Sequence, residues 1–150
     1  MRVLCFLLFS AALLHGCSDT AGAEPEAALG RFLDLMDRSR GDAHALSEAY
    51  ELLDRNSQKE LARRARKAQA LSGRDFEPWQ MLAEGRFRLR FSPSAGGMHT
   101  ELEGKRRARI TLVGEETELQ ATVPMIQQGG TWRVVLSLPS TDTAGADSAQ

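Results

Sequence analysis

Cysteine and aromatic residues are scarce in this chain of 150 residues, which has two cysteines, one tyrosine and two tryptophans. Both cysteines, Cys5 and Cys17, lie near the N-terminus, so no disulfide can cross-link the remainder of the chain. Its stability must therefore come from a packed hydrophobic core. The net charge of −1 argues against nucleic acid or anionic lipid as the main partner. The longest apolar run, Val3–Leu14, is shorter than the roughly 20 residues that span a bilayer.

The N-terminus does contain the pattern of a secretory signal peptide. A basic start, Met1-Arg2, is followed by the apolar run and then by Leu14-His15-Gly16-Cys17. This ending resembles a bacterial lipoprotein signal, in which the cysteine receives a diacylglyceryl group and becomes the new N-terminus. The resemblance implies a signal peptide over residues 1–16 and a lipidated Cys17 that carries palmitate-type acyl chains. An uncleaved or ordinarily cleaved signal is the alternative.

Such an anchor implies a protein of the cell envelope that faces the periplasm. Ser18 rather than aspartate follows Cys17, so the usual inner-membrane retention signal of enteric lipoproteins is missing and the outer membrane is favoured. Residues 17–26 are small, polar and proline-containing, which predicts a lipidated flexible tether. Residues 139–150 contain no large apolar side chain, which predicts a disordered tail. The folded unit is then one domain over residues 27–138.

Apolar residues at helical spacing predict helices in the first half of this domain. The predicted apolar stripes are Leu29, Phe32, Leu33 and Met36; Leu46, Ala49, Tyr50 and Leu53; and Leu61, Ala65, Ala68 and Leu71, with a further helical turn over 78–82. Gly41 and Asp42 predict a helix stop and a new N-cap. Ser57 followed by Glu60 predicts a capping box, and Gly73 predicts the end of that helix.

The second half has the two-residue period of strands. Strands are predicted over Arg86–Phe91, Arg109–Val113, Thr117–Ile126 and Trp132–Leu138. Ser92–His99 is predicted as a loop, with Gly96-Gly97 at a hairpin tip. The side chains predicted to face inward on the last two strands are Leu119, Ala121, Val123, Met125, Trp132, Val134 and Leu136. Together these patterns predict an α+β domain in which N-terminal helices pack on a curved antiparallel four-stranded sheet.

Several of these segments resemble the nuclear transport factor 2-like (cystatin-like cone) superfamily, and more narrowly uncharacterised bacterial lipoproteins of that fold. They are Gly41-Asp42 before a helix ending in Tyr50-Glu51-Leu52-Leu53, the Pro78-Trp79-x-x-Leu82 element, and Gly130-Thr131-Trp132-Arg133-Val134. The resemblance covers about Leu29 to Leu138. It implies no single function, because the fold serves isomerases, dehydratases, transport adaptors and protein-binding modules.

Tyr50, Trp132 and Met125 are the candidates for lining a pocket inside the cone. A tyrosine hydroxyl there could stabilise a developing oxyanion, as in an isomerase or dehydratase, whereas the alternative is a core residue whose hydroxyl bonds at the rim. No carboxylate is among the predicted inward positions, so we expect a non-catalytic module that binds an envelope protein or a small apolar ligand. His44 and His99 lack the spacing of metal ligands. We assign no catalytic, cofactor or metal residue.

Basic residues form a second candidate site. Arg86, Arg88 and Arg90 would share one strand face, and Lys105, Arg106, Arg107 and Arg109 follow in the next segment. A further basic run on the predicted polar side of the third helix consists of Arg63, Arg64, Arg66 and Lys67. Such residues can be a solvated face that discourages strand pairing, or a contact for an anionic partner such as lipid headgroups near the anchor. The expected partners are therefore the membrane, through the lipid, and an envelope protein, but not nucleic acid.

Overall fold

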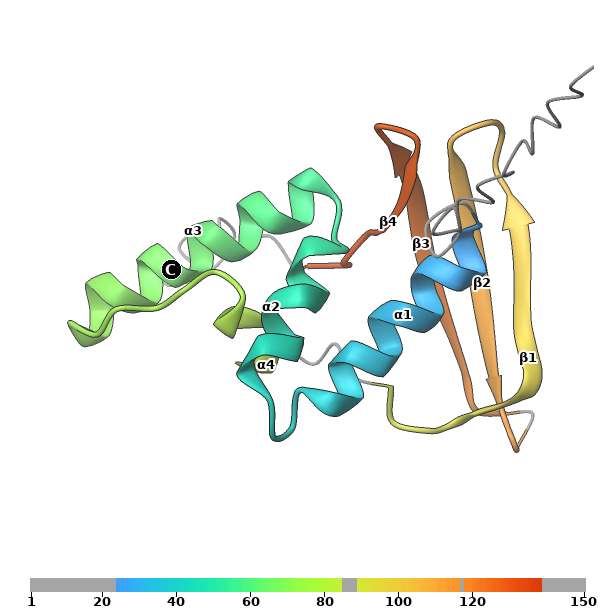
Figure 1. Ribbon diagram of the computed structural model, residues 1–150, viewed down its shortest axis with the longest axis horizontal. Coiled ribbons are helices and arrows are strands. Elements are labelled where there is room, and N and C mark those ends of the chain that lie inside the picture. The colour runs from blue at the N-terminus through green and yellow to red at the C-terminus, as the bar shows by residue number, and fades with distance from the viewer. Residues whose placement is uncertain (1–23, 85–88, 117, 139–150) are drawn as a thin grey trace, which may run out of the picture.

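A computed structural model describes residues 24–84, 89–116 and 118–138, and it has the predicted α+β fold: helices followed by a curved, open antiparallel sheet (Figure 1). The elements are α1 (Pro25–Arg38), α2 (Ala43–Glu51), α3 (Arg55–Ser72), α4 (Gln80–Glu84), β1 (Pro93–Leu102), β2 (Arg107–Gly114), β3 (Gln120–Gln128) and β4 (Thr131–Val134). Helix α1 crosses one face of the sheet, and α2, α3 and α4 lie beyond the β4 edge. The predicted signal peptide, Cys17 and the tail lie outside the described residues.

Helix α1 begins two residues before the predicted domain boundary. Pro25 occupies the first turn, where its missing N–H costs no hydrogen bond, and its side chain is buried. The end of the segment predicted as a tether therefore belongs to the folded domain. The predicted apolar stripe faces the core, where Leu29 and Met36 are fully buried. Leu35 joins them, because a helix that lies between a sheet and a second helix buries more than one narrow stripe.

Aspartates cap both of the next helices. The Asp42 carboxylate accepts the backbone N–H of His44 at 2.8 Å, as predicted for the start of α2. The capping box predicted at Ser57 is wrong, because the N-cap of α3 lies three residues earlier. Asp54 is its N-cap, and the carboxylate accepts the backbone N–H groups of Asn56 at 2.9 Å and Ser57 at 3.1 Å. An aspartate that reaches two donors displaces the serine as cap.

The end of α3 lies partly outside the core. Gly73 terminates the helix in the left-handed conformation, with φ of 70°, as predicted. Leu61 and Ala65 are buried, but Leu71, predicted to share their stripe, is 80% exposed. Figure 1 shows that the last turns of α3 extend past α4, away from the sheet.

The sheet is a meander in the order β1-β2-β3-β4, with every neighbouring pair antiparallel. The last three predicted strands are confirmed. The first is not: residues 89–91 lie outside the sheet, Arg86 and Arg88 fall outside the described residues, and the predicted loop Ser92–His99 contributes most of β1. Alternation over 86–91 had favoured a strand, but β1 is an edge strand whose pairing with β2 outweighs its weak local pattern.

Gly96 and Gly97, predicted at a hairpin tip, lie instead in a bulge of β1. The register shifts between Pro93, opposite Gly114, and Met98, opposite Leu112, so β1 carries extra residues there. Gly96 is left-handed, with φ of 74°. A Cβ on the buried Gly97 would lie 2.5 Å from the carbonyl oxygen of Val113, so only glycine lets the two strands approach.

The core lies between the inner sheet face and the helices. Its buried hydrophobic residues are Ala28, Leu29, Phe32, Leu35, Met36, Ala45, Leu46, Ala49, Leu53, Leu61, Ala65, Met81, Leu82, Ala108, Ile110, Leu112, Met125, Trp132 and Val134. Of the predicted inward positions, Met125, Trp132 and Val134 are fully buried. Leu119 is 41% exposed, because it precedes β3 at the end of the sheet.

A buried polar junction joins the helices to β4. The Ser57 hydroxyl donates to the Asp54 carboxylate and accepts the backbone N–H of Leu136 at 2.9 Å. The Asp54 N–H donates to the Val134 carbonyl at 2.9 Å, and the Val134 N–H donates to the Leu52 carbonyl at 3.0 Å. Asp54 and Ser57 are the only polar side chains classed as buried among the described residues.

Replacement of Asp54 by alanine should destabilise the protein by about 2–4 kcal/mol, because it removes the cap of α3 and leaves buried donors unpaired. Asp42→Ala is the matched control, since Asp42 caps α2 from an exposed position and its loss should cost only about 0.5–1 kcal/mol. Urea denaturation of the two variants measures the difference. Equal losses would show that the junction adds nothing beyond an ordinary cap.

Gly97→Ala should destabilise the protein by about 1–3 kcal/mol, because the added methyl group must displace the β2 backbone. Gly30→Ala, in the middle of α1 with nothing within 4 Å of the new Cβ, should instead stabilise it by about 0.5–1 kcal/mol. Thermal unfolding of both variants measures whether the two changes in stability have opposite signs. A harmless Gly97→Ala would contradict the close approach of β1 to β2.

Candidate functional site

The three predicted pocket residues belong to the core or pack against it. Met125 and Trp132 are 2% and 6% exposed and belong to the core, and Tyr50 packs against it half-buried. None of the three lines any of five surface depressions that the described residues form. They therefore act as core residues in this structure, which is the alternative interpretation of the sequence pattern.

The Tyr50 hydroxyl is used in a helix-to-helix contact. It donates to the backbone carbonyl of Gln58 at 3.3 Å, and the Gln58 side-chain amide donates to the Tyr50 carbonyl at 3.0 Å. This reciprocal pair joins α2 to α3. Burial raises the pKa of Tyr50, and the negative charge of Glu51 raises it further. The hydroxyl is thus a neutral donor with a backbone partner, which differs from a tyrosine poised over a substrate.

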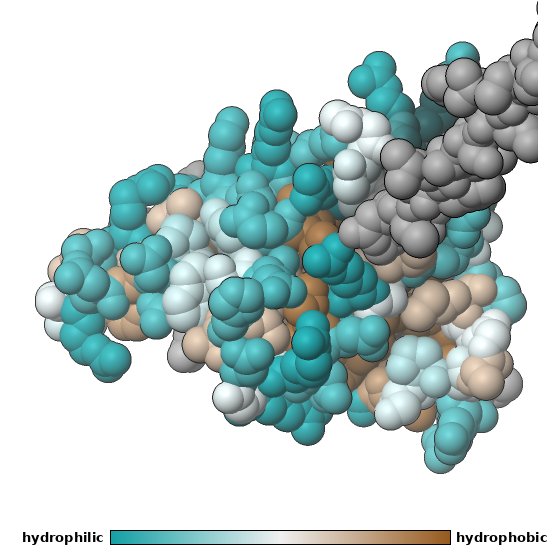
Figure 2. All heavy atoms as spheres, in the orientation of Figure 1, coloured by the Kyte–Doolittle hydropathy of each residue, from teal (hydrophilic) through white to brown (hydrophobic). Residues whose placement is uncertain are grey.

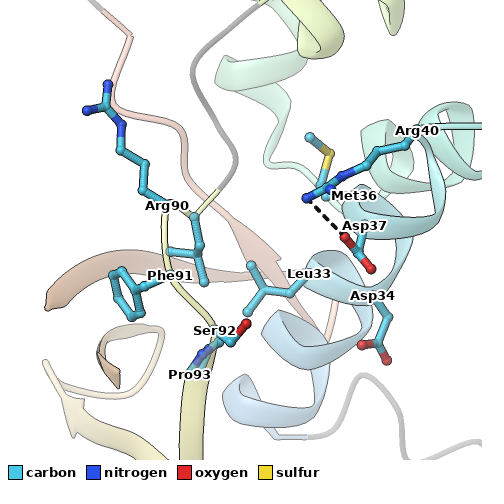
Figure 3. A pocket seen from close by; sticks show the side chains of 10 residues that line it. Leu33, Asp34, Met36, Asp37, Arg40, Arg90, Phe91, Ser92 and Pro93 are labelled. Atoms are coloured by element: carbon cyan, nitrogen blue, oxygen red, sulfur yellow. Dashed lines mark ion pairs between the residues drawn. The ribbon is translucent and has the colours of Figure 1, made fainter. Parts of the chain in front are cut away.

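One open groove of about 450 Å³ lies between α1 and the segment that leads into β1 (Figure 3). Its lining residues are Leu33, Asp34, Met36, Asp37, Arg40, Leu89, Arg90, Phe91, Ser92 and Pro93. Arg40 pairs with Asp37 at 3.4 Å, and Figure 3 shows Arg90 directed away from both aspartates. The groove offers an apolar floor with mixed charges at its rim, and no combination of groups there indicates a reaction.

A second depression, of about 630 Å³, is basic. It lies where the β1–β2 hairpin, the β3–β4 hairpin and the start of α3 come together, and Figure 1 shows these three segments side by side at one end of the strands. Arg55, Arg106 and Arg107 line it with Ile126 and the segment 127–130. No carboxylate is among these lining residues. We call this site the arginine depression.

The predicted basic patch is only partly present. Arg86 and Arg88 lie outside the described residues. Arg90 precedes Pro93, which pairs with Gly114 at one end of β2, whereas Arg107 starts β2 at the other end. A strand rises about 3.3 Å per residue, so Arg90 and Arg107 lie at opposite ends of the sheet. The two halves of the predicted patch therefore do not converge.

Three of the other predicted basic residues have acidic partners. Arg109 forms ion pairs with Glu103 and, at 4.0 Å, with Glu101. On α3, the Glu60 carboxylate accepts from Arg63 at 2.9 Å and from Arg64 at 3.1 Å. Desolvation opposes ionisation of Glu60, but the bonds from these two arginines outweigh it and lower its pKa. Arg106 and Arg107 are instead brought to Arg55, which sequence patterns did not single out.

Neither histidine of residues 24–84, 89–116 and 118–138 belongs to a cluster of potential metal ligands. His44 forms an exposed pair with Glu48 at 3.0 Å, and His99 is exposed on β1. No group of three potential metal-ligating side chains forms within these ranges. In the same ranges, no helix combines the length and the apolarity needed to cross a bilayer.

Comparison of the chain with protein-family models, with curated proteins and with solved structures finds no match. The resemblance to nuclear transport factor 2-like lipoproteins therefore stays a prediction from the quoted sequence segments alone.

Because the chain has a single tyrosine, its absorbance at alkaline pH reports Tyr50 alone. We expect the native protein to titrate with a midpoint above the ordinary tyrosine value of about 10, and the urea-unfolded protein to titrate near that value. A raised native pKa means that stability falls as the pH increases beyond about 10, since the unfolded chain then releases the proton more readily. A native midpoint at or below 10 would contradict the buried, hydrogen-bonded hydroxyl.

Proposed function

We propose that this chain is a lipid-anchored cell-envelope protein whose α+β domain, of the nuclear transport factor 2-like type, is a non-catalytic binding module. The anchoring part rests on the N-terminal sequence, in which an apolar segment ends in Leu14-His15-Gly16-Cys17. Cys17 is the residue that would carry the lipid. The Ser18 that follows favours the outer membrane, with the domain facing the periplasm.

The non-catalytic part is supported best by Tyr50. An isomerase or dehydratase of the alternative type needs a hydroxyl that is free to donate to substrate, with a carboxylate beside it in an open pocket. Here the hydroxyl donates to the Gln58 carbonyl, and Met125 and Trp132 fill the core. Recognition of an envelope protein would then use the outer surface, while a small apolar ligand would have to displace core side chains.

The proposed anchor also limits where the domain can work. The eight residues from Cys17 to Glu24 can span at most about 28 Å even when fully extended. Helix α1 starts at Pro25, so the start of the domain would stay within that distance of the headgroups. A binding module held this close meets membrane-bound partners at a high effective concentration.

Replacing Cys17 by serine should abolish incorporation of labelled palmitate and release the protein from membranes, or leave an unprocessed precursor. Cys5→Ser is the matched control, because it makes the same change within the signal segment and should leave labelling intact. Radiolabelling and membrane fractionation in a bacterial host measure both outcomes. Palmitate incorporation that survives Cys17→Ser would refute the proposed lipidation site.

A further inference from the structure

We propose that the arginine depression binds a phosphate or phosphate-ester group through Arg55, Arg106 and Arg107. This inference deepens the proposed binding function and rests on that part of it, but it does not depend on the lipid anchor. The ligand can come from two sources that share this chemistry, a phospholipid headgroup or a soluble phosphate ester.

Hydrogen bonds of the backbone fix the positions of the three arginines relative to strand β3, although 51 positions separate Arg55 from Arg106. The Gln127 N–H donates to the Arg106 carbonyl at 2.8 Å, which fixes the β1–β2 hairpin against β3. The Arg55 N–H donates to the Gln128 side-chain carbonyl at 3.2 Å, which fixes the start of α3 against the same strand. Arg107 lies opposite Ile126 in the β2–β3 register. The convergence of the three arginines is therefore built into the fold.

The charges of these arginines are uncompensated within the described residues. Arg40, Arg63, Arg64 and Arg109 each pair with a carboxylate, whereas no ion pair forms at Arg55, Arg106 or Arg107 in residues 24–84, 89–116 and 118–138. Glu51 lines an adjoining depression that shares Arg55 and Gln128. Glu103 donates its N–H to the Arg107 carbonyl at 2.8 Å, but its carboxylate pairs with Arg109. Three like charges that face one depression repel each other unless an anion occupies it.

Phosphate is the anion that fits this set of donors. Guanidinium groups present paired N–H donors that match two phosphate oxygens, and such charge-assisted bonds are among the strongest in proteins. Gly129 and Gly130 form the adjacent turn with φ of 62° and 83°, so no side chain of that turn obstructs the approach of a ligand. No aromatic residue lines the depression, which disfavours a stacked nucleic-acid base.

Figure 2 shows hydrophilic side chains projecting along the edge that carries α3 and the two hairpins. The exposed Arg66 and Lys67 also lie on α3, about 16–18 Å along the helix from Arg55 at 1.5 Å per residue. They carry the same charge as the hairpin arginines but lie outside the arginine depression. Substitutions of Arg66 and Lys67 therefore distinguish binding of an anion at the arginine depression from general attraction of anions to basic surface.

The test is isothermal titration calorimetry of the purified full chain in neutral detergent, with inorganic pyrophosphate and with short-chain phosphatidylglycerol as separate probes. We expect saturable binding of at least one probe that weakens as salt is added. Arg106→Gln/Arg107→Gln should lower the affinity roughly tenfold or more. Arg66→Gln/Lys67→Gln, with an equal change of charge, should leave it within about twofold. Circular dichroism melting checks that both variants fold.

The outcomes separate the sources and the hypotheses. Binding of phosphatidylglycerol alone assigns the site to lipid headgroups, binding of pyrophosphate alone assigns it to soluble phosphate compounds, and binding of both supports the shared chemistry. Absence of saturable binding of either probe, or an equal loss in the two double variants, overturns the site. A failed palmitate-labelling experiment removes the proposed anchor but leaves this titration unaffected, so the two proposals fail independently.

Discussion

The buried Asp54 carboxylate connects the helical layer to the sheet, and the relative position of the two depends on it. Its oxygens accept the N–H groups of Asn56 and Ser57 and the Ser57 hydroxyl, so the carboxylate is satisfied in a site that is only 3% exposed. The Ser57 hydroxyl oxygen in turn accepts the N–H of Leu136, which extends the hydrogen-bond network to the segment after β4. Strand β4 is four residues long and lies at the sheet edge, so this junction supplies backbone partners that no fifth strand provides.

The arginine depression follows from the same junction. Arg55 is the residue directly after Asp54, and its N–H bonds to Gln128 rather than to the cap. The cap thus fixes the axis of α3, and the Gln128 amide fixes its first residue against the β3–β4 hairpin. A helix start shifted to Ser57, as the sequence pattern suggested, would leave Arg55 in a loop with no defined place beside Arg106. A three-residue difference in the cap decides whether a three-arginine site exists.

Local signals predicted much of the fold because they act within one turn or one hairpin. Asp42 before an apolar stripe and Gly73 after one specify helix ends through bonds to near neighbours, and the Gly129-Gly130 pair specifies a tight turn. Local sequence patterns predicted the structure wrongly where contacts between distant residues determine it. The edge strand β1 exists through pairing with β2, and Gly97 is required by the Val113 backbone, 16 positions away. Alternation at 86–91 carried no such information.

The candidate site shows the same division more sharply. Tyr50 was singled out because it is the one tyrosine on an apolar stripe, yet its hydroxyl partner is a backbone carbonyl that no side-chain pattern reveals. Arg106 and Arg107 were recognised within a basic run, but Arg55, which completes their site, looks like any polar residue at a helix start. A net charge near zero also concealed the separation of charge along the sheet.

That separation has a direction. The β1–β2 turn contributes Lys105 and Arg106 at one end of the strands, and the β2–β3 turn contributes the exposed Glu115, Glu116 and Glu118 at the other. Near the arginines, Glu103 of the β1–β2 turn pairs with Arg109, and Glu51 lines the adjoining depression. The three glutamates of the β2–β3 turn lie a strand length away from the arginines, about 25 Å for the eight residues of β2. At physiological ionic strength the Debye length is about 8 Å, so these acids cannot neutralise the arginine depression. A chain with almost no net charge can in this way still present a strongly cationic site, because the distance between charges, rather than their sum, sets the local potential.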